Sequence, residues 1–179
     1  VATHLAASAG AMTWMFCEWW TRGKPSVLGM ISGAIAGLGT ITPASGFVLP
    51  WHGVLIGVIA GAFCFWACTK LKQMLGYDDS LDVFGVHGVG GFTGTLLTGV
   101  FAVGAISASP ETPGGSPGLL EGNAQQVVIQ LYAIAATIVW SGVATWVILK
   151  LINVFAPLRV SQQQEVEGLD ITQHGEALQ

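Results

Sequence analysis

The sequence predicts an all-α integral membrane protein with five transmembrane helices, and composition is the first reason. Of the 179 residues, 52% are hydrophobic and only 9% are charged. A soluble domain usually has about 25% charged residues, and the mean hydropathy here is +0.64. So few charged side chains could not cover the surface of a water-soluble domain. The 25 glycines and 7 tryptophans are typical of closely packed helices in a bilayer.

The second reason is the series of apolar stretches, since a spanning helix needs roughly 20 mostly apolar residues. The first stretch, about 2–20, has no charged residue before Glu18. The second, about 27–40, is short and rich in glycine. Pro25 and Pro43 flank it and suit a helix start and a helix stop. Both stretches are therefore predicted to be helices.

Three further stretches complete the predicted transmembrane region, residues 1–156. The third, about 53–69, ends at Lys70. The fourth, about 81–103, follows an Asp-Asp-Ser sequence at 78–80 that is typical of a helix N-cap. The fifth, about 126–156, would be roughly 46 Å long as a helix. It must tilt in the bilayer or project beyond it.

The distribution of basic residues is the third reason, and it predicts an orientation. Residues 41–52 and 104–125 join predicted spans and contain no Lys or Arg. All the basic residues fall in the other connections or at the end of the last span: Arg22, Lys24, Lys70, Lys72, Lys150 and Arg159. The positive-inside rule places that side in the cytoplasm. The N-terminus of this chain is then outside, and the tail 157–179 is cytoplasmic.

The two ends of the chain have different compositions. The tail is polar and acidic, which favours disorder, with docking on a partner as the alternative. The chain begins with Val1, directly in an apolar stretch that lacks the basic region of a signal peptide. We therefore expect it to be part of a longer protein.

Glycine recurs at every fourth position in two of the predicted helices. Such faces let helix backbones approach closely in lipid, and dense packing is the first interpretation. The alternative is that the small residues leave room for a narrow passage. The glycines are Gly29, Gly33 and Gly37 in one helix, and Gly53, Gly57 and Gly61 in the next.

His87 is the histidine that the sequence places inside a span, about 9 Å along the fourth helix. A polar group at that depth usually faces a bundle interior or a water path. It could be a pore-lining imidazole that passes a proton, or a packing histidine bonded to a carbonyl. Asp82 is expected to be a structural cap in the first turn, and Glu18 to lie near Arg22. The remaining histidines, His4, His52 and His174, are expected at interfaces or in solvent.

Several classes of function are disfavoured by what the sequence lacks. It has no phosphate-binding Gly-Lys-Ser/Thr loop, no metal-ligand cluster and no Ser/His/Asp arrangement. We therefore expect no enzyme activity, no metal and no cofactor. The net charge of −4 leaves no basic patch for nucleic acid. Three cysteines without a C-x-x-C pair argue against a disulfide framework.

Several segments of the chain resemble the ammonium transporter (Amt/Rh) family, bacterial type. The resemblance covers essentially the whole chain, and the run from Asp78 to Gly91 around His87 is its most specific part. The matching segments are 23–26, 33–38, 41–44 and 78–91, together with 167–170 and 174–176 in the tail.

The resemblance implies an eleven-helix fold of two inverted five-helix repeats and a long final helix, assembled as a homotrimer. This chain is similar to its C-terminal half, spans seven to eleven. His87 then matches the second of two pore histidines, and Val83, one turn toward the cytoplasm, lines the same passage. The implied location is the inner (plasma) membrane, with ammonium or ammonia as substrate and methylammonium as its analogue.

The tail resemblance implies docking of a PII-type signalling protein at the cytoplasmic face. The residues that carry it are Gly168, Leu169, Asp170, His174 and Gly175. Ammonium transport is the leading function, through a narrow hydrophobic pore with a proton-handling histidine. The alternatives are a membrane ammonium sensor or receptor, and a non-functional truncated fragment. A channel for another small solute is a weaker interpretation.

Overall fold

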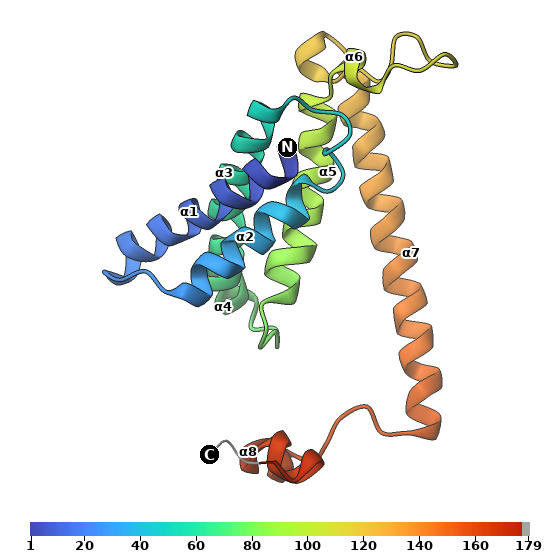
Figure 1. Cartoon of the computed structure of the whole chain (residues 1–179). Coiled ribbons are helices and arrows are strands. Elements are labelled where there is room, and N and C mark those ends of the chain that lie inside the picture. The colour runs from blue at the N-terminus through green and yellow to red at the C-terminus, as the bar shows by residue number, and fades with distance from the viewer. Residues whose placement is uncertain (177–179) are drawn as a thin grey trace. The chain divides into compact units, whose positions relative to one another are not determined.

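The computed structural model describes residues 1–176 and contains only helices and loops over that part of the chain. It divides into two compact units, Val1–Ile134 and Ala135–Gln179. The last three residues of the expected tail, 177–179, lie outside the described residues. Figure 1 shows the helices in chain order, from α1 at the N-terminus to α8 in the tail. The all-α class predicted from composition is confirmed for the described residues.

Three helices form the first part of unit 1: α1 (Ala2–Arg22), α2 (Val27–Ile41) and α3 (Pro50–Trp66). Helix α1 ends at Gly23, whose φ of 75° turns the chain out of the helix. The Ser26 side chain then caps α2 by accepting the Gly29 N–H at 2.9 Å. Pro50 stands at the start of α3, where a missing N–H costs nothing.

Helix α1 packs against both α2 and α3 through small residues. Its buried positions recur every four residues and include Ala2, Ala6, Gly10, Trp14 and Glu18. A Cβ added at Gly33 of α2 would lie 2.5 Å from the Trp14 Cβ. A Cβ at Gly53 of α3 would lie 2.5 Å from the Ala2 carbonyl oxygen. Real Cβ atoms do not approach that closely, so the glycine faces serve close helix packing, as predicted.

A buried carboxylate joins α1 to the start of α2. Glu18 is only 4% exposed, and it accepts hydrogen bonds from the Ser26 N–H at 2.8 Å and the Ser26 Oγ at 2.9 Å. The Arg22 guanidinium lies 3.5 Å from the same carboxylate, as the sequence predicted. Glu18 therefore fixes the turn between the two helices. The Arg22 guanidinium and the Ser26 donors compensate its buried charge.

Replacing Glu18 with alanine is expected to destabilise the protein by about 1–3 kcal/mol, because the Ser26 N–H and the Ser26 hydroxyl both lose their acceptor. Thermal unfolding of the purified membrane protein in detergent measures this effect. A Lys24→Ala change, in the adjoining exposed turn, is the matched control. Equal midpoints for the two variants would contradict the assigned role.

The rest of unit 1 brings a further helix against α2 and α3. Helix α3 continues without a break through the π-helical turn η1 (Ala67–Leu71) and the short α4 (Lys72–Leu75). After a loop, the π-helical turn η2 (Phe84–Gly88) leads into α5 (Val89–Phe101). Helix α5 crosses α2 at Gly90 and Gly94, and a Cβ at Gly90 would lie 3.0 Å from the Thr40 Oγ1.

The connection after α5 has little regular structure, as its prolines and glycines predicted. It contains the short helix α6 (Gly104–Ser107) and the 3-10 turn η3 (Leu119–Glu121). The Glu121 carboxylate accepts the Gly104 N–H at 2.7 Å and thereby ties the two together. Helix α7 (Gln125–Phe155) follows, and its buried position is Ile134.

The tail contains two short helices, α8 (Gln162–Glu167) and the π-helical turn η4 (Asp170–His174). Composition favoured disorder here, so this expectation is corrected over the described residues. The physical reason is a capping box, in which Ser161 and Gln164 exchange side-chain and backbone hydrogen bonds. Arg159 adds an ion pair to Glu165 at 2.6 Å, and this pairing lowers the pKa of that exposed carboxyl.

The helices coincide closely with the five predicted apolar stretches. Two continuous helical segments are long and apolar enough to cross a membrane, Pro50–Leu75 and Gln125–Phe155. The second of these buries only 6% of its most apolar window inside the structure, which leaves its apolar side chains exposed. Helix α2 is apolar but shorter, with 15 residues. Length and composition thus identify two candidate spans rather than five.

Candidate functional site: the His87 helix

His87 lies in the π-helical turn η2, at the start of the helix that continues as α5. A π-helical turn contains an extra residue per turn and is frequent at functional sites. Gly85 and Val86 in this turn are buried against the core of unit 1. A Cβ at Gly85 would collide with the Cys68 Sγ, and the Cys64 thiol lies 3.8 Å from the Val86 carbonyl. These contacts press one side of the turn against α3 and η1.

The opposite side of the same turn is exposed and carries the two predicted pore residues. Val83 is 52% exposed, and His87, one turn further along, is also exposed. The nearest part of α2 is Gly39, where an added Cβ would lie 3.9 Å from the His87 Nδ1. Within residues 1–176 the imidazole makes no hydrogen bond, so the packing alternative, a histidine bonded to a carbonyl, has no partner among these residues.

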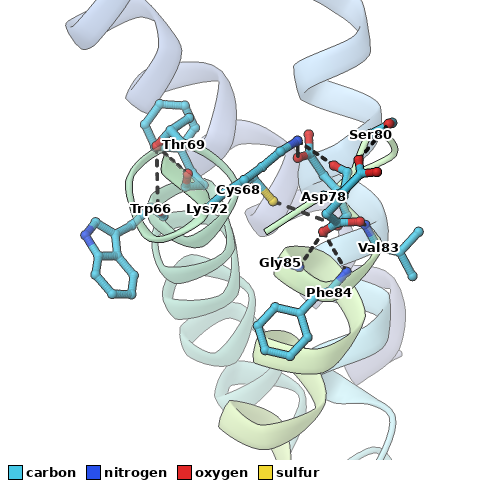
Figure 2. A network of polar contacts seen from close by, with 12 residues as sticks. Trp66, Cys68, Thr69, Lys72, Asp78, Ser80, Val83, Phe84 and Gly85 are labelled. Atoms are coloured by element: carbon cyan, nitrogen blue, oxygen red, sulfur yellow. Dashed lines mark hydrogen bonds and ion pairs between the residues drawn. The ribbon is translucent and has the colours of Figure 1, made fainter. Parts of the chain in front are cut away.

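The N-terminus of this helix is capped by Asp79, and the prediction that Asp82 is the cap is wrong. The Asp79 carboxylate accepts the Val83 N–H at 2.8 Å and the Phe84 N–H at 2.9 Å, with the Gly85 N–H at 3.5 Å (Figure 2). The Asp-Asp-Ser cap cluster at 78–80 is thereby confirmed. Asp79 occupies the cap position because the chain between it and Val83 turns back through residues 80–82.

Asp82 instead forms an ion pair with the Lys72 ammonium at 2.9 Å. Its φ of +56° is in the left-handed region, where a non-glycine residue is uncommon. Lys72 also donates a short hydrogen bond to the Asp79 carbonyl. Lys72, the first residue of α4, thus holds both Asp79 and Asp82, which precede the His87 helix. The ion pair between Lys72 and Asp82 could not be predicted from the sequence, because the two residues are ten positions apart.

Replacing Asp79 with alanine is expected to lower the stability of the protein by about 2 kcal/mol, the upper range for a lost N-cap. The reason is that its carboxylate serves several N–H groups of the η2 turn. The midpoint of thermal unfolding measures the effect. Ser80→Ala is the matched control in the same loop, where the hydroxyl donates to the Asp78 carboxylate at 3.5 Å rather than to the η2 turn. If the two variants melt alike, the capping assignment fails.

The other histidines have separate environments. His52 is buried, and its Nδ1 accepts the Leu49 N–H at 3.2 Å at the start of α3. It also stacks near Trp51, with ring centroids 3.8 Å apart. The expectation of an interfacial residue is therefore corrected to a buried helix cap. His4 is exposed on α1, and His174 is exposed in the tail.

The predicted docking residues of the tail lie around the end of α8 and in η4, within unit 2. Gly168 ends α8 with a φ of 105°, and Gly175 ends η4 with a φ of 67°. These left-handed conformations require little strain only for glycine. Leu169, Asp170 and His174 are exposed. The tail thus presents an apolar, an acidic and an imidazole side chain between two glycine-defined turns.

No group of three or more His, Cys, Asp or Glu side chains is arranged to hold a metal ion anywhere in the described part of the chain. The three cysteines are free thiols there. The chemistry available at the His87 helix is therefore that of one exposed imidazole beside apolar side chains. Such a ring has one nitrogen that can donate a proton and one that can accept it.

Comparison with known proteins gives a consistent set of relatives. The model of the Ammonium Transporter Family matches residues 1–178. An ammonium transporter of Bacillus subtilis is 47% identical over 98% of this chain and 42% of its own length. The chain therefore spans about two fifths of the length of such relatives. The ammonium transporter Amt1 of Archaeoglobus fulgidus is 41% identical over 98% of the chain.

Solved structures show the same fold. The crystal structure of Saccharomyces cerevisiae Mep2 superposes with a TM-score of 0.79 and 39% identity, over 90% of this chain and 36% of that one. A sensor Amt protein superposes with a TM-score of 0.80 and 26% identity, over 96% of this chain and 40% of the other. The helix arrangement described above is therefore that of a segment of these larger proteins.

Proposed function

This chain belongs to the ammonium transporter family, and on that premise we propose that the protein containing it carries ammonium across a membrane. The single observation that supports the proposal most is the placement of His87. Its ring and the Val83 side chain lie on the exposed side of a helix whose other side is packed and capped. The chain spans about 42% of the length of its Bacillus subtilis relative. We therefore expect that further segments of the protein that contains this chain cover the exposed side of the helix.

The physical reason for a histidine in such a pore is the cost of moving a charge through hydrocarbon. An ammonium ion without compensating groups cannot cross an apolar passage. Removal of its proton yields neutral ammonia, which a narrow apolar pore can pass. The His87 imidazole can hold the proton because one of its ring nitrogens accepts it and the other can donate one. Transport of this kind makes and breaks no covalent bond other than that to the proton, so we propose no enzyme activity.

We propose that the five long helical segments all span the membrane, as the C-terminal part of an eleven-helix homotrimer. Segments Pro50–Leu75 and Gln125–Phe155 have the length and hydropathy to do so unaided. The other three carry apolar residues and pack tightly with them or with each other. The basic residues support an orientation with the tail in the cytoplasm of a cell whose inner membrane holds the protein.

Deletion of residues 161–179 is expected to abolish binding of a PII-type signalling protein at the cytoplasmic face. The tail supports this proposal because Leu169, Asp170 and His174 are exposed between turns that glycines define. Co-sedimentation of the partner with membranes measures it, comparing the intact and the shortened protein. The Ser8→Ala variant, changed on α1 far along the chain, is the control. Equal retention by both membranes would contradict the proposal.

A second candidate function is ammonium sensing, favoured by the superposition on a sensor Amt protein. A sensor would bind ammonium at the same site without net flux. The distinguishing experiment is uptake of labelled methylammonium by liposomes containing the natural, full-length protein. Uptake above that of empty liposomes supports transport. Ammonium binding without uptake supports a sensor. The absence of both binding and uptake supports the non-functional alternative. The intact mass of the natural protein, compared with 18.6 kDa for this chain, shows whether the remaining segments are present.

A further inference from the structure

Lys72 is a charged side chain that the proposed proton chemistry does not use, although it contacts the loop just before the His87 helix. It is the first residue of α4, on the helical segment that continues α3. Its ammonium lies 2.9 Å from the Asp82 carboxylate and donates a short hydrogen bond to the Asp79 carbonyl. Lys72 therefore connects the end of one helical segment to the loop that starts the next.

We propose that Lys72 is a positioning residue for ammonium transport, which fixes the start of the helix that carries Val83 and His87. This inference rests on the proposed transport function and names a further residue that serves it. Lys72 acts through Asp79 and Asp82, because these residues accept its hydrogen bonds. Misplacing a reacting group by 1 Å can cost about 100-fold in rate. The start of this helix is therefore a sensitive point for transport.

The contact with Asp82 holds the backbone acceptor of the first helical turn. The Asp82 carbonyl accepts the Val86 N–H at 2.9 Å, and its direction depends on the left-handed φ of +56° at Asp82. A non-glycine residue keeps this conformation only where its surroundings hold it there. The Lys72 ion pair is such a restraint, since it binds the Asp82 side chain from outside the loop.

The contact with Asp79 holds the residue that caps the helix. The Asp79 carbonyl accepts hydrogen bonds from both the Lys72 ammonium and the Asp82 N–H, the latter at 3.2 Å. The Asp79 carboxylate accepts the Val83 and Phe84 N–H groups. Lys72 thus fixes the backbone of the residue whose side chain caps the helix. Without the ammonium, the cap would remain bonded to the helix, but its backbone would lose an anchor on α4.

The orientation of the η2 turn depends on Lys72 more than on the packing beside it. Cys68, one turn before Lys72, lies against Gly85, where an added Cβ would collide with the Cys68 Sγ. Both side chains point from the same helical segment toward the loop and the turn (Figure 2). An apolar contact limits how closely two turns approach but has no preferred direction. The hydrogen bonds of Lys72 are directional, so they select one orientation of the turn.

Uptake of methylammonium by liposomes that contain the full-length protein tests the proposal with the variant Lys72→Met. We expect uptake to fall about ten-fold, less than the roughly 100-fold cost of a fully misplaced group. The midpoint of thermal unfolding should fall by about 4 °C at most, because a partly exposed ion pair contributes little to stability. Lys72→Arg keeps a cation with enough donors for both acceptors, so it should restore uptake.

Asp82→Asn completes a double-mutant cycle, because asparagine tolerates the left-handed conformation but has no charge. It should lower uptake by itself, since it removes the ion pair. The double variant should lose no more uptake than Lys72→Met alone, because the two residues act as one unit. Normal uptake by Asp82→Asn, or single losses that multiply in the double variant, would overturn the proposal.

Hydrogen exchange of backbone amides measures the helix start independently of transport. Lys72→Met should speed exchange in residues 83–88 about ten-fold and leave α2 unchanged, because only the helix start opens more often. The matched control is Lys70→Met, which removes an exposed cation of η1 whose ammonium makes no ion pair within residues 1–176. Its exchange and uptake should equal those of the unchanged protein.

The two measurements together separate the possible results. Slower uptake with faster exchange in residues 83–88 supports positioning by Lys72. Faster exchange with normal uptake would show a purely structural role, and unchanged exchange would show that Lys72 does not hold the helix start; either result overturns the proposal. If the unchanged protein takes up no methylammonium, the proposed transport function fails, while the exchange comparison still decides whether Lys72 positions the His87 helix.

Discussion

A His87→Ala variant of the full-length protein is expected to lose methylammonium uptake by about 100-fold, the usual contribution of a positioned proton-transfer group. The variant should nonetheless fold and assemble. The His87 ring is exposed, contacts little of unit 1 and makes no hydrogen bond within residues 1–176. Stopped-flow uptake into liposomes measures the flux, and thermal unfolding in detergent measures stability. Loss of flux at unchanged midpoint is the predicted combination.

The control is His4→Ala, which removes another exposed histidine, on α1. Its uptake should equal that of the unchanged protein. A His87→Asn variant retains a polar side chain but cannot carry a proton near neutral pH, so it should behave like His87→Ala. Normal uptake by His87→Asn would show that polarity rather than proton transfer matters. Normal uptake by both variants would remove His87 from the pore.

A Gly57→Ala variant is expected to be destabilised by about 1–3 kcal/mol, as in other overpacked cores. A Cβ at Gly57 would lie 2.8 Å from the Ala6 Cα and still closer to the Ala6 carbonyl oxygen. These are backbone atoms, so only a movement of α1 relative to α3 can relieve the clash. Alanine would otherwise favour a helix over glycine by up to about 1 kcal/mol. The clash therefore reverses the sign of the intrinsic preference.

Gly142→Ala supplies the matched comparison, because Gly142 is also helical and has nothing within 4 Å of its added Cβ. That variant should melt at or slightly above the midpoint of the unchanged protein. Thermal unfolding of both variants in one detergent measures the difference. If Gly57→Ala were as stable as Gly142→Ala, the close approach of α1 and α3 would be refuted.

The sequence alone determined the class of the protein and the position of its helices. The small number of charged residues and the long apolar stretches predicted a bundle of membrane helices. Pro25, Pro43 and Pro50 lie near helix boundaries. The four-residue spacing of Gly53, Gly57 and Gly61 predicted close packing, because helix geometry places such residues on one face. These signals are local, so they can be identified from neighbouring positions in the chain. The tail's capping box, Ser161 to Gln164, is equally local, although the composition of the tail favours disorder.

Only the tertiary structure decided which aspartate does what before the His87 helix. Asp79 and Asp82 both suit a cap by residue type, and the left-handed φ of Asp82 assigns the cap to Asp79 and the ion pair to Asp82. The partner, Lys72, comes from another helix, and a contact across a turn leaves no periodic signal. The same holds for Arg22 and Lys70, which line one groove because α1 packs on α3. Spacing along the chain specifies faces, whereas the packing of helices specifies which faces meet.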